Sequence, residues 1–351
     1  MDPTARARIA ITPLGIATLI LFVALCTWVE YVFWAREHAS NMDELLGASD
    51  GVLRGTPHWR AFQNRLLTPY LLDLFRNISE NPYNEFAKVF LILENFVLCI
   101  CAYALTRRVS LTVLALVASS ALWVYCMHYF SYPWDFTESV MLTFLFLLAI
   151  RSEGIFPFVM LFIVFLLSRE SCTFIGLFLI LRGVSPIAFS RRIEVRSLTW
   201  GSILIVVGVA ITELLRKTLF KASMLPGVGA DTLHEKFENH FHYLHNGKVF
   251  LVGSKGYDIS LIYAMLMLVF LACAYVGYRE KARNLLAIGI TMTLYTLSIF
   301  IFGVLDEVRL YQPMTGILSL TVLYLLFETG SRQKWRATNL PFLTRRGWSK
   351  T

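Results

Sequence analysis

The sequence predicts an all-α integral membrane protein, a single transmembrane domain over residues 1–351 with about ten transmembrane or half-membrane helices. Apolar residues make up 56% of the chain and charged residues only 16%, whereas about a quarter of a soluble domain is charged. The apolar residues fall in runs long enough to cross a bilayer. Despite a net charge of +8, the basic residues lie mostly between these runs, which indicates a role in membrane orientation rather than nucleic-acid binding.

Apolar runs define the helices that we expect, in chain order, at residues 9–34, 84–106, 109–127, 135–150, 155–168, 171–182, 198–215, 258–278, 284–304 and 311–328. The first run follows a basic segment and is too long for the core of a signal peptide, so we expect it to be retained. The fifth and sixth runs are each too short to cross a core of about 30 Å at about 1.5 Å per residue. They are either two half-helices that meet at Arg169 and Glu170 or one long tilted helix, which would make nine spans.

The positive-inside tendency distinguishes these two alternatives. With ten crossings and a cytoplasmic N-terminus, every short basic connection lies in the cytoplasm. With nine crossings, the basic connection at 279–283 and the basic tail at 329–351 would lie outside. We therefore expect both termini in the cytoplasm and two long outer loops with short interfacial helices, at about 35–83 and 216–257. The unusual polar residues then gather on one side of the membrane.

The segment 59–70 of the first outer loop, WRAFQNRLLTPY, combines polar and aromatic residues. On a helix, Arg60, Gln63 and Asn64 share a face, and the nearby aromatic rings favour the membrane interface. The guanidinium fork of Arg60 or Arg65 matches phosphate oxygens, so one interpretation is a lipid-phosphate site. The alternative, of equal weight, is an anchor that reaches lipid head groups. The other charged residues of this loop are individually interpreted as solvated.

Four ionisable residues lie at the outer ends of expected helices. Asp135 is placed to cap a helix N-terminus. Glu138 lies one turn deeper, where a carboxylate is costly without a partner. Arg169 and Glu170 interrupt a long apolar stretch. They indicate either a functional site or a structural ion pair, with each other or with Asp135.

Two further outer segments carry candidate site residues. Glu307 and Arg309 lie at the outer mouth of the last helix. The loop 216–257 holds four histidines, of which His240 and His242 are weak metal candidates. Interleaved aromatic residues favour a membrane-surface segment that covers the site instead. The sequence has no glycine-rich phosphate loop, G-x-S-x-G or H-E-x-x-H motif, which argues against an ATP-driven pump or a soluble-type hydrolase.

The order of four motifs carries a family resemblance over most of the chain. They are WRAFQNRLLTP at 59–69, YPWDFT at 132–137, SRES at 168–171 and EVRLYQP at 307–313. This order resembles that of bacterial polytopic membrane proteins related to the GT-C glycosyltransferases. The resemblance implies a GT-C-like fold in a bacterial cell membrane. It also implies transfer of a sugar from a polyprenyl-phosphate carrier, at the outer face, to a lipid-linked or protein acceptor.

The resemblance further implies an acidic residue of the first outer loop as general base and, in some members, a divalent cation such as Mg²⁺ or Mn²⁺. The candidates by position are Asp43, Glu44 and Asp50. This loop departs from the family because it has no Asp-x-Asp or Glu-x-Asp pair. Such a reaction needs a base for the acceptor hydroxyl and cations for the leaving phosphate. Arginines of the outer turns could supply those cations: Arg60, Arg65, Arg169 and Arg309.

Two other functions remain open from the sequence. The first is a transporter or flippase of a lipid-linked or anionic substrate, in which Glu138, Arg169 and Glu170 form an intramembrane relay. The second is a non-catalytic partner of another membrane protein that keeps a GT-C-like fold, which the missing acidic pair supports. The expected partners are membrane lipid and a polyprenyl-phosphate-linked sugar, with no nucleic acid.

Overall fold

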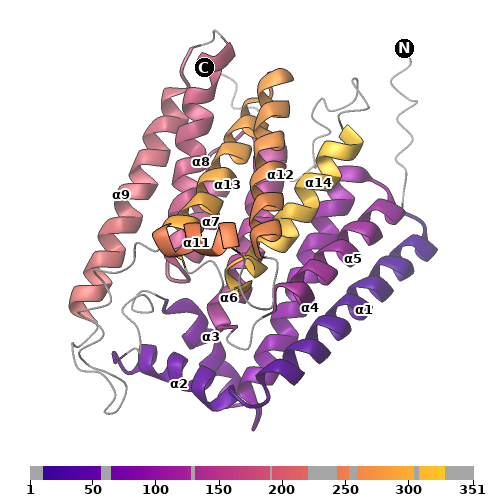
Figure 1. Cartoon of the computed structure of the whole chain (residues 1–351), viewed down its shortest axis with the longest axis vertical. Helices are drawn as coiled ribbons and strands as arrows, with labels where there is room; N and C mark the ends of the chain where they lie inside the picture. The colour runs from indigo at the N-terminus through magenta and orange to yellow at the C-terminus, as the bar shows by residue number, and fades with distance from the viewer. Residues whose placement is uncertain are drawn as a thin grey trace, which may run out of the picture.

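The computed structural model describes residues 11–56, 65–127, 131–189, 192–219, 243–252, 259–303 and 308–328. All regular secondary structure in this part of the chain is helical (Figure 1). The long elements are α1 (Pro13–His38), α4 (Pro82–Thr106), α5 (Val109–Tyr125), α6 (Pro133–Arg151), α7 (Phe156–Phe165), α8 (Thr173–Val184), α9 (Val195–Thr218), α12 (Ile259–Arg279), α13 (Arg283–Phe302) and α14 (Thr315–Glu328). The shorter ones are α2 (Met42–Leu53), α3 (Leu67–Arg76), α11 (Tyr243–Val252), η3 (Glu170–Cys172), η4 (Ser185–Phe189), η5 (Val308–Leu310) and η6 (Gln312–Met314).

Seven helical segments are long and apolar enough to cross a membrane, so the chain is an integral membrane protein. Six of them are α1, α4, α6, α9, α12 and α13, and the seventh is α8 together with its flanking 3₁₀ turns. The helices α5, α7 and α14 are apolar but shorter. Each expected helix is therefore present within a few residues of its expected bounds, while the number of full crossings stays a prediction.

The fifth and sixth runs form two helices that pack as a hairpin. The rings of Phe158 on α7 and Phe178 on α8 lie 5.0 Å apart, and each is ten residues from the turn at Ser168. At the far end of the hairpin, the Arg182 guanidinium donates to the carbonyl of Glu153. The chain therefore reverses direction between α7 and α8. The alternative of one long tilted helix is wrong.

The connections alternate between two ends of the bundle. At one end, Arg283 pairs with Glu194 at 2.5 Å and the Asn284 amide donates to the Ser152 carbonyl at 3.5 Å. This end gathers the basic connections that the charge pattern predicts for the cytoplasm. At the other end, the Leu67 amide donates to the Leu167 carbonyl at 2.8 Å and so joins the first loop to the α7–α8 turn.

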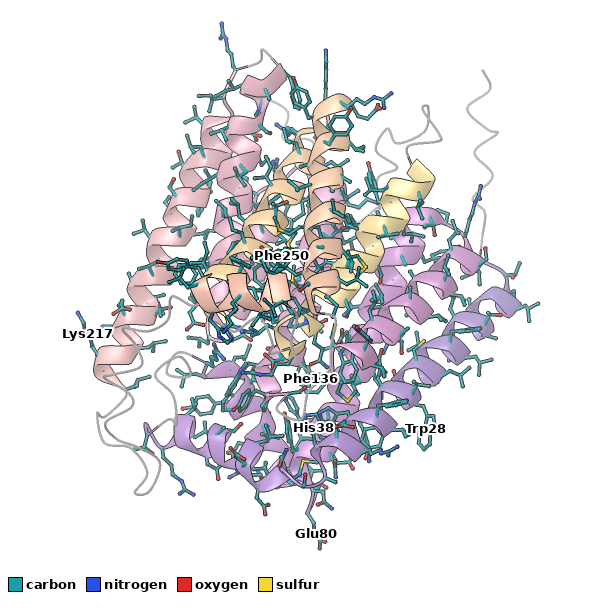
Figure 2. The ribbon with its side chains drawn as sticks, viewed as in Figure 1. Trp28, His38, Glu80, Phe136, Lys217 and Phe250 are labelled. Carbon is teal, nitrogen blue, oxygen red and sulfur yellow. The ribbon has the colours of Figure 1, made fainter. Side chains whose placement is uncertain are left out.

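The first loop folds as a compact helical layer at this second end, made of α2 and α3. Leu45 and Val52 of α2 and Leu72 of α3 are buried against Trp34 and Phe86. The proline of α3 lies in its first turn, where a missing N–H costs no helical hydrogen bond. In Figure 2 this layer closes the lower end of the bundle, while Trp28 projects from α1 on the outer flank, where lipid is expected.

Glycines allow two helix pairs to approach closely. Cβ atoms on Gly176 and Gly201 would each lie within 3 Å of the other residue's carbonyl oxygen, at 2.8 and 2.6 Å, across α8 and α9. A Cβ on Gly289 would lie 2.4 Å from the Ala274 nitrogen, across α12 and α13. Small residues let backbones pack together in a bilayer, where dispersion rather than water exclusion joins helices. In Figure 1 the α8–α9 pair lies on the side of the bundle opposite α1, and α14 lies between the α12–α13 pair and α5.

Candidate functional site

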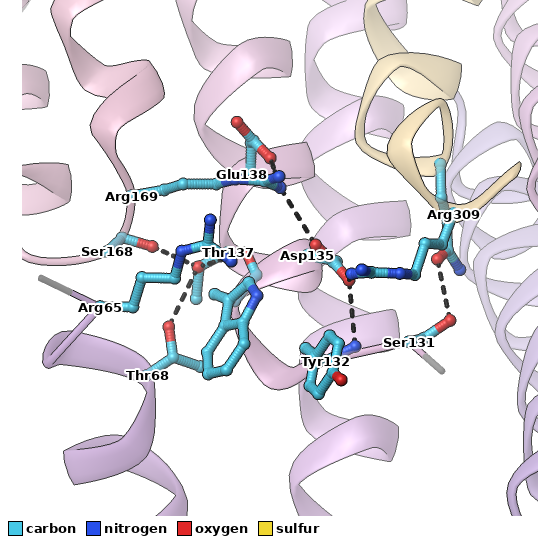
Figure 3. Close-up of polar contacts among 12 residues, drawn as sticks. Arg65, Thr68, Ser131, Tyr132, Asp135, Thr137, Glu138, Ser168, Arg169 and Arg309 are labelled. Atoms are coloured by element: carbon cyan, nitrogen blue, oxygen red, sulfur yellow. Dashed lines mark hydrogen bonds and ion pairs between the residues drawn. The ribbon is translucent and has the colours of Figure 1, made fainter. Parts of the chain in front are cut away.

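A charged cluster lies where the first loop meets the start of α6, the α7–α8 turn and η5 (Figure 3). Segments more than 200 residues apart along the sequence meet there. We call it the charged cluster and define it by seven residues: Arg65, Asp135, Glu138, Arg169, Glu170, Tyr295 and Arg309.

Arg169 holds the centre of the charged cluster. Its Nη1 donates to Asp135 Oδ1 at 3.1 Å and also contacts Glu138 Oε2. The two carboxylates are three residues apart on α6, so they present one face to the guanidinium. Their side chains are only 1% and 0% exposed, against 15% for Arg169. The intramembrane cost expected for Glu138 is thus offset by an arginine. The contact of Arg169 with Asp135 is one of the alternatives that the sequence left open.

Asp135 combines a capping role with a second ion pair. Its Oδ2 accepts a hydrogen bond from the Tyr132 amide at 3.0 Å and so caps the N-terminus of α6. The same oxygen lies 3.6 Å from Arg309 Nη1. The Arg309 guanidinium also stands 4.7 Å above the Tyr132 ring, in a cation–π arrangement. Asp135 therefore joins the last outer turn to the α7–α8 turn.

Glu138 has one further partner, which sequence reasoning missed. The Tyr295 hydroxyl on α13 donates to Glu138 Oε1 at 2.9 Å, and the Phe174 ring packs edge-on against Tyr295 at 5.0 Å. Tyr295 lies 157 residues from Glu138 inside an apolar run. Its only signal in the sequence is a hydroxyl in a membrane span, which many structural tyrosines share.

Arg65 lies at the edge of the charged cluster. Its Nη2 is 3.7 Å from Glu170 Oε2, and its guanidinium stacks 5.1 Å over the Trp134 ring. Burial lowers the pKa of Arg65 to about 10, against the opposite effect of Glu170. Arg65 therefore remains a cation at neutral pH. Glu170 is 35% exposed at its side chain, so it is the most accessible of the three carboxylates in the cluster.

Neutral hydrogen bonds hold the same segments together. The Thr137 hydroxyl lies 3.2 Å from the Thr68 hydroxyl and 2.5 Å from the Ser168 hydroxyl, so three elements share one contact point. Buried polar groups that are satisfied in this way rigidify their surroundings. These hydrogen bonds therefore hold in place the backbone segments that carry the charged side chains.

A buried histidine supports the turn that precedes α6. The Ser131 amide donates to His38 Nε2 at 3.0 Å, so the ring proton is assigned to Nδ1, which lies 2.8 Å from the Trp34 carbonyl. The Tyr83 hydroxyl donates to the Ser131 carbonyl at 2.5 Å, and the Ser131 hydroxyl donates to Gln312 at 3.2 Å. His38 is fully buried, which corrects the expectation that it is solvated: it ends α1 instead of lying in the loop.

Asp50 belongs to a different group of residues. It pairs with Arg76 at the end of α3 and lies 3.9 Å from Arg54. Thr68, at the start of α3, contacts Thr137, which lies between Asp135 and Glu138 on α6. Eight residues of helix separate Thr68 from Arg76, which is about 12 Å along the axis. Asp50 therefore lies near the end of α3 that is farther from Thr137, whereas a base has to lie within hydrogen-bond reach of the proton that it takes.

The other two predicted catalytic carboxylates, Asp43 and Glu44, are exposed on α2. Asp43 lines a surface hollow of about 560 Å³ beside α3. The remaining lining residues are Leu46, Gly47, Asp50, Arg76, Ser79, Glu80 and Pro82. The hollow combines three carboxylates with one arginine, so its chemistry suits a hydroxyl-rich or cationic group more than a phosphate.

Several predicted site residues lie outside the described part of the chain: Arg60, Gln63, Asn64, Glu307, and the weak metal candidates His240 and His242. Within the described residues, no group of three or more His, Cys, Asp or Glu side chains could hold a metal ion. These residues do not fit the divalent cation that the family resemblance implies, and we assign it no step.

The charged cluster contains three arginines and three carboxylates, so its formal charge is balanced. A guanidinium that is buried against a carboxylate can exchange that partner for a phosphate, because both offer the same paired oxygens. Glu170, at 3.7 Å from Arg65, is the partner most easily exchanged. The cluster therefore has the chemistry to exchange one carboxylate for another anionic group.

No known family model matches the chain, and neither a curated protein nor a solved structure matches it. Functional inference therefore rests on the residues and contacts described above.

Proposed function

We propose that the protein is a membrane glycosyltransferase of the GT-C type, which transfers a sugar from a polyprenyl-phosphate carrier to an acceptor hydroxyl at the outer face of the membrane. The observation that carries this proposal is the convergence of Arg65, Arg169 and Arg309 from three separate segments at one end of the bundle. Guanidinium groups in a poorly solvated site suit a lipid phosphate.

The proposed reaction needs two kinds of group. The acceptor oxygen attacks the anomeric carbon of the sugar, and the bond from that carbon to the carrier phosphate breaks. The phosphate leaves with the electron pair, and the acceptor proton passes to a carboxylate base. The arginines bind the phosphate and offset the charge that develops on it as the bond breaks.

Two sets of carboxylates are candidates for the base. Position in the first outer loop favours Asp43, Glu44 and Asp50, which could act after α2 moves towards the charged cluster. Exposure favours Glu170, because an acceptor can reach its side chain, whereas Asp135 and Glu138 are enclosed. A base has to lie within hydrogen-bond reach of the acceptor hydroxyl, so Glu170 is the candidate that needs the smaller rearrangement.

The first experiment measures binding of fluorescent polyprenyl phosphate to the full chain in lipid nanodiscs, with the uncharged polyprenol as the reference ligand. Replacing Arg309 or Arg65 by Gln should weaken phosphate binding about 10–100-fold, since a charge-assisted hydrogen bond contributes about 1.5–3 kcal/mol. Arg36→Gln is the matched control, because Arg36 is exposed in the last turn of α1, at the same end of the bundle. Unchanged binding in both cluster variants would remove the proposed phosphate site.

The second experiment follows release of polyprenyl phosphate from a carrier-linked sugar. Glu170→Gln should keep phosphate binding and lose turnover if Glu170 is the base. Loss of turnover in Asp43→Asn, Glu44→Gln or Asp50→Asn alone would assign the base to the first loop instead. Binding without release in the wild-type protein would favour a flippase or a non-catalytic partner over an enzyme.

A further inference from the structure

A second polar cluster lies inside the bundle, between α1, α4, α5 and α6. It contains two carboxylates, Glu30 on α1 and Glu94 on α4, which are 2% and 4% exposed. Glu30 precedes the end of α1 by eight residues, which is about 12 Å along the helix. Glu94 follows the start of α4 by twelve residues, about 18 Å. Both carboxylates therefore lie well within the span of their helices.

Neutral groups surround the two carboxylates. The Asn95 amide donates to Glu30 Oε2 at 2.5 Å and lies 3.4 Å from the Thr27 hydroxyl. The Ser139 hydroxyl donates to Glu94 Oε1. The second oxygen of Glu94, Oε2, is buried without a hydrogen bond of normal geometry among the described residues, and the Trp123 indole is a donor that faces Glu94. A buried carboxylate oxygen in this position needs a hydrogen-bond donor or a cation to face it.

The pair lacks a basic partner in the described part of the chain. Glu30 and Glu94 lie close enough for their charges to interact, and neither takes part in an ion pair there. Lys88, six residues earlier on α4, pairs with Glu85 at 2.7 Å. Glu138 offers the comparison: it is equally buried, and Arg169 compensates it. Two uncompensated carboxylates in an apolar bundle are too costly to persist as such.

The groups that face the pair come from four helices. Ser120 of α5 hydrogen-bonds Glu30, and the Trp123 indole of the same helix borders Glu94. Ser139 belongs to α6. The Cys26 thiol, one turn earlier on α1, is the other titratable group beside Glu30. All of these can donate hydrogen bonds and none brings a positive charge.

We propose that Glu30 and Glu94 form an intramembrane binding site for one exchangeable monovalent cation, either a proton or Na⁺. One positive charge between the carboxylates removes their repulsion and supplies the cation that the pair lacks among the described residues. The donors from Asn95, Ser120 and Ser139 stabilise the remaining negative charge. A proton needs a single oxygen, whereas Na⁺ would also use the hydroxyl oxygens around the pair. This site does not depend on the proposed glycosyl transfer.

The test is carbodiimide labelling of the full chain in nanodiscs, because dicyclohexylcarbodiimide is apolar and modifies protonated carboxyl groups. Mass spectrometry would quantify the label on Glu30 and Glu94 between pH 5.5 and 9, in sodium chloride or choline chloride. Glu138 is the internal control, since Arg169 already supplies a cation to it. Labelling of the pair should exceed that of Glu138 and fall by up to about tenfold per pH unit as the proton is released. Protection by sodium, compared with choline, would identify Na⁺ as the ligand, and its absence would identify the proton.

A second measurement does not require the carbodiimide to reach Glu30 and Glu94. Glu94→Gln replaces the acid by a neutral group of the same shape, so it should fold and its thermal midpoint should lose the response to pH or sodium. Glu138→Gln is the matched variant and should keep that response. The proposal is overturned if the pair is labelled no more than Glu138 and if wild type and Glu94→Gln respond identically to pH and sodium.

Discussion

Replacing Arg169 by methionine should be among the most damaging single changes at the outer end of the bundle. Methionine keeps an apolar stem of comparable length and removes the guanidinium that contacts both Asp135 and Glu138. Asp135 would keep the Tyr132 amide and Arg309. Among the described residues, Glu138 would keep its hydrogen bond from the Tyr295 hydroxyl. The variant thus leaves one fully buried carboxylate without the cation that contacts it.

The expected cost follows from that stranded charge. Removing one partner of a buried ion pair costs about 3–5 kcal/mol of unfolding free energy. Adding Glu138→Gln to Arg169→Met removes the stranded charge and should recover about 1–3 kcal/mol, the usual coupling between residues in contact. Arg76→Met is the matched control. Its pair with Asp50 is partly exposed, so its loss should cost less than about 1 kcal/mol.

The measurement is reversible unfolding in mixed micelles by titration with a denaturing detergent, followed by tryptophan fluorescence. The comparison uses the unfolding free energies of Arg169→Met, of Arg76→Met and of the Arg169→Met/Glu138→Gln double variant. If Arg169→Met were no more destabilising than Arg76→Met, the charged cluster would be hydrated in the native protein. The charged cluster would then not be a desolvated head-group site.

Three further predictions test separate features. Tyr295→Phe removes the hydroxyl that donates a hydrogen bond to Glu138 and should lower the unfolding free energy by about 1–3 kcal/mol in the same assay. An unchanged unfolding free energy would mean that water replaces this hydrogen bond. Gly289→Val should destabilise the protein by at least about 1–3 kcal/mol, because even a Cβ would lie 2.4 Å from the α12 backbone; wild-type stability would show that α12 and α13 pack less closely. All six native cysteines are buried, so a membrane-impermeant maleimide should react mainly with an introduced cysteine. It should label Asp43→Cys from outside the cell and Arg279→Cys only after lysis. The reverse pattern would mean that the orientation in the membrane is opposite to the expected one.

Much of the helical organisation is readable from local sequence. An apolar run long enough to cross a bilayer has few alternatives to a helix, because unpaired backbone groups are costly in hydrocarbon. The run at 84–106 accordingly becomes α4 with nearly the expected bounds. The cost of an intramembrane charge likewise pointed to Glu138 and Arg169. The same criterion applies to Glu30 and Glu94, which lie inside the apolar runs of α1 and α4.

Other features depend on packing between distant segments. The helices α2 and α3 lie in a loop of mixed polarity, so their bounds carry no long apolar signal, and they form against Trp34 and Phe86. Asp50 and Asp135 both lie at the expected outer end, yet α3 holds them apart through Arg76. No local pattern distinguishes a carboxylate that pairs with a surface arginine from one that reaches the charged cluster.

Chain order and apolar run lengths were sufficient for the membrane class and for the approximate position of each long helix, because backbone desolvation acts residue by residue along the chain. The identity of each charge's partner was not accessible in this way. Glu138 meets Tyr295 across 157 residues, and that contact exists only because α6 and α13 pack side by side. Pairings over such separations depend on the whole three-dimensional arrangement of the helices.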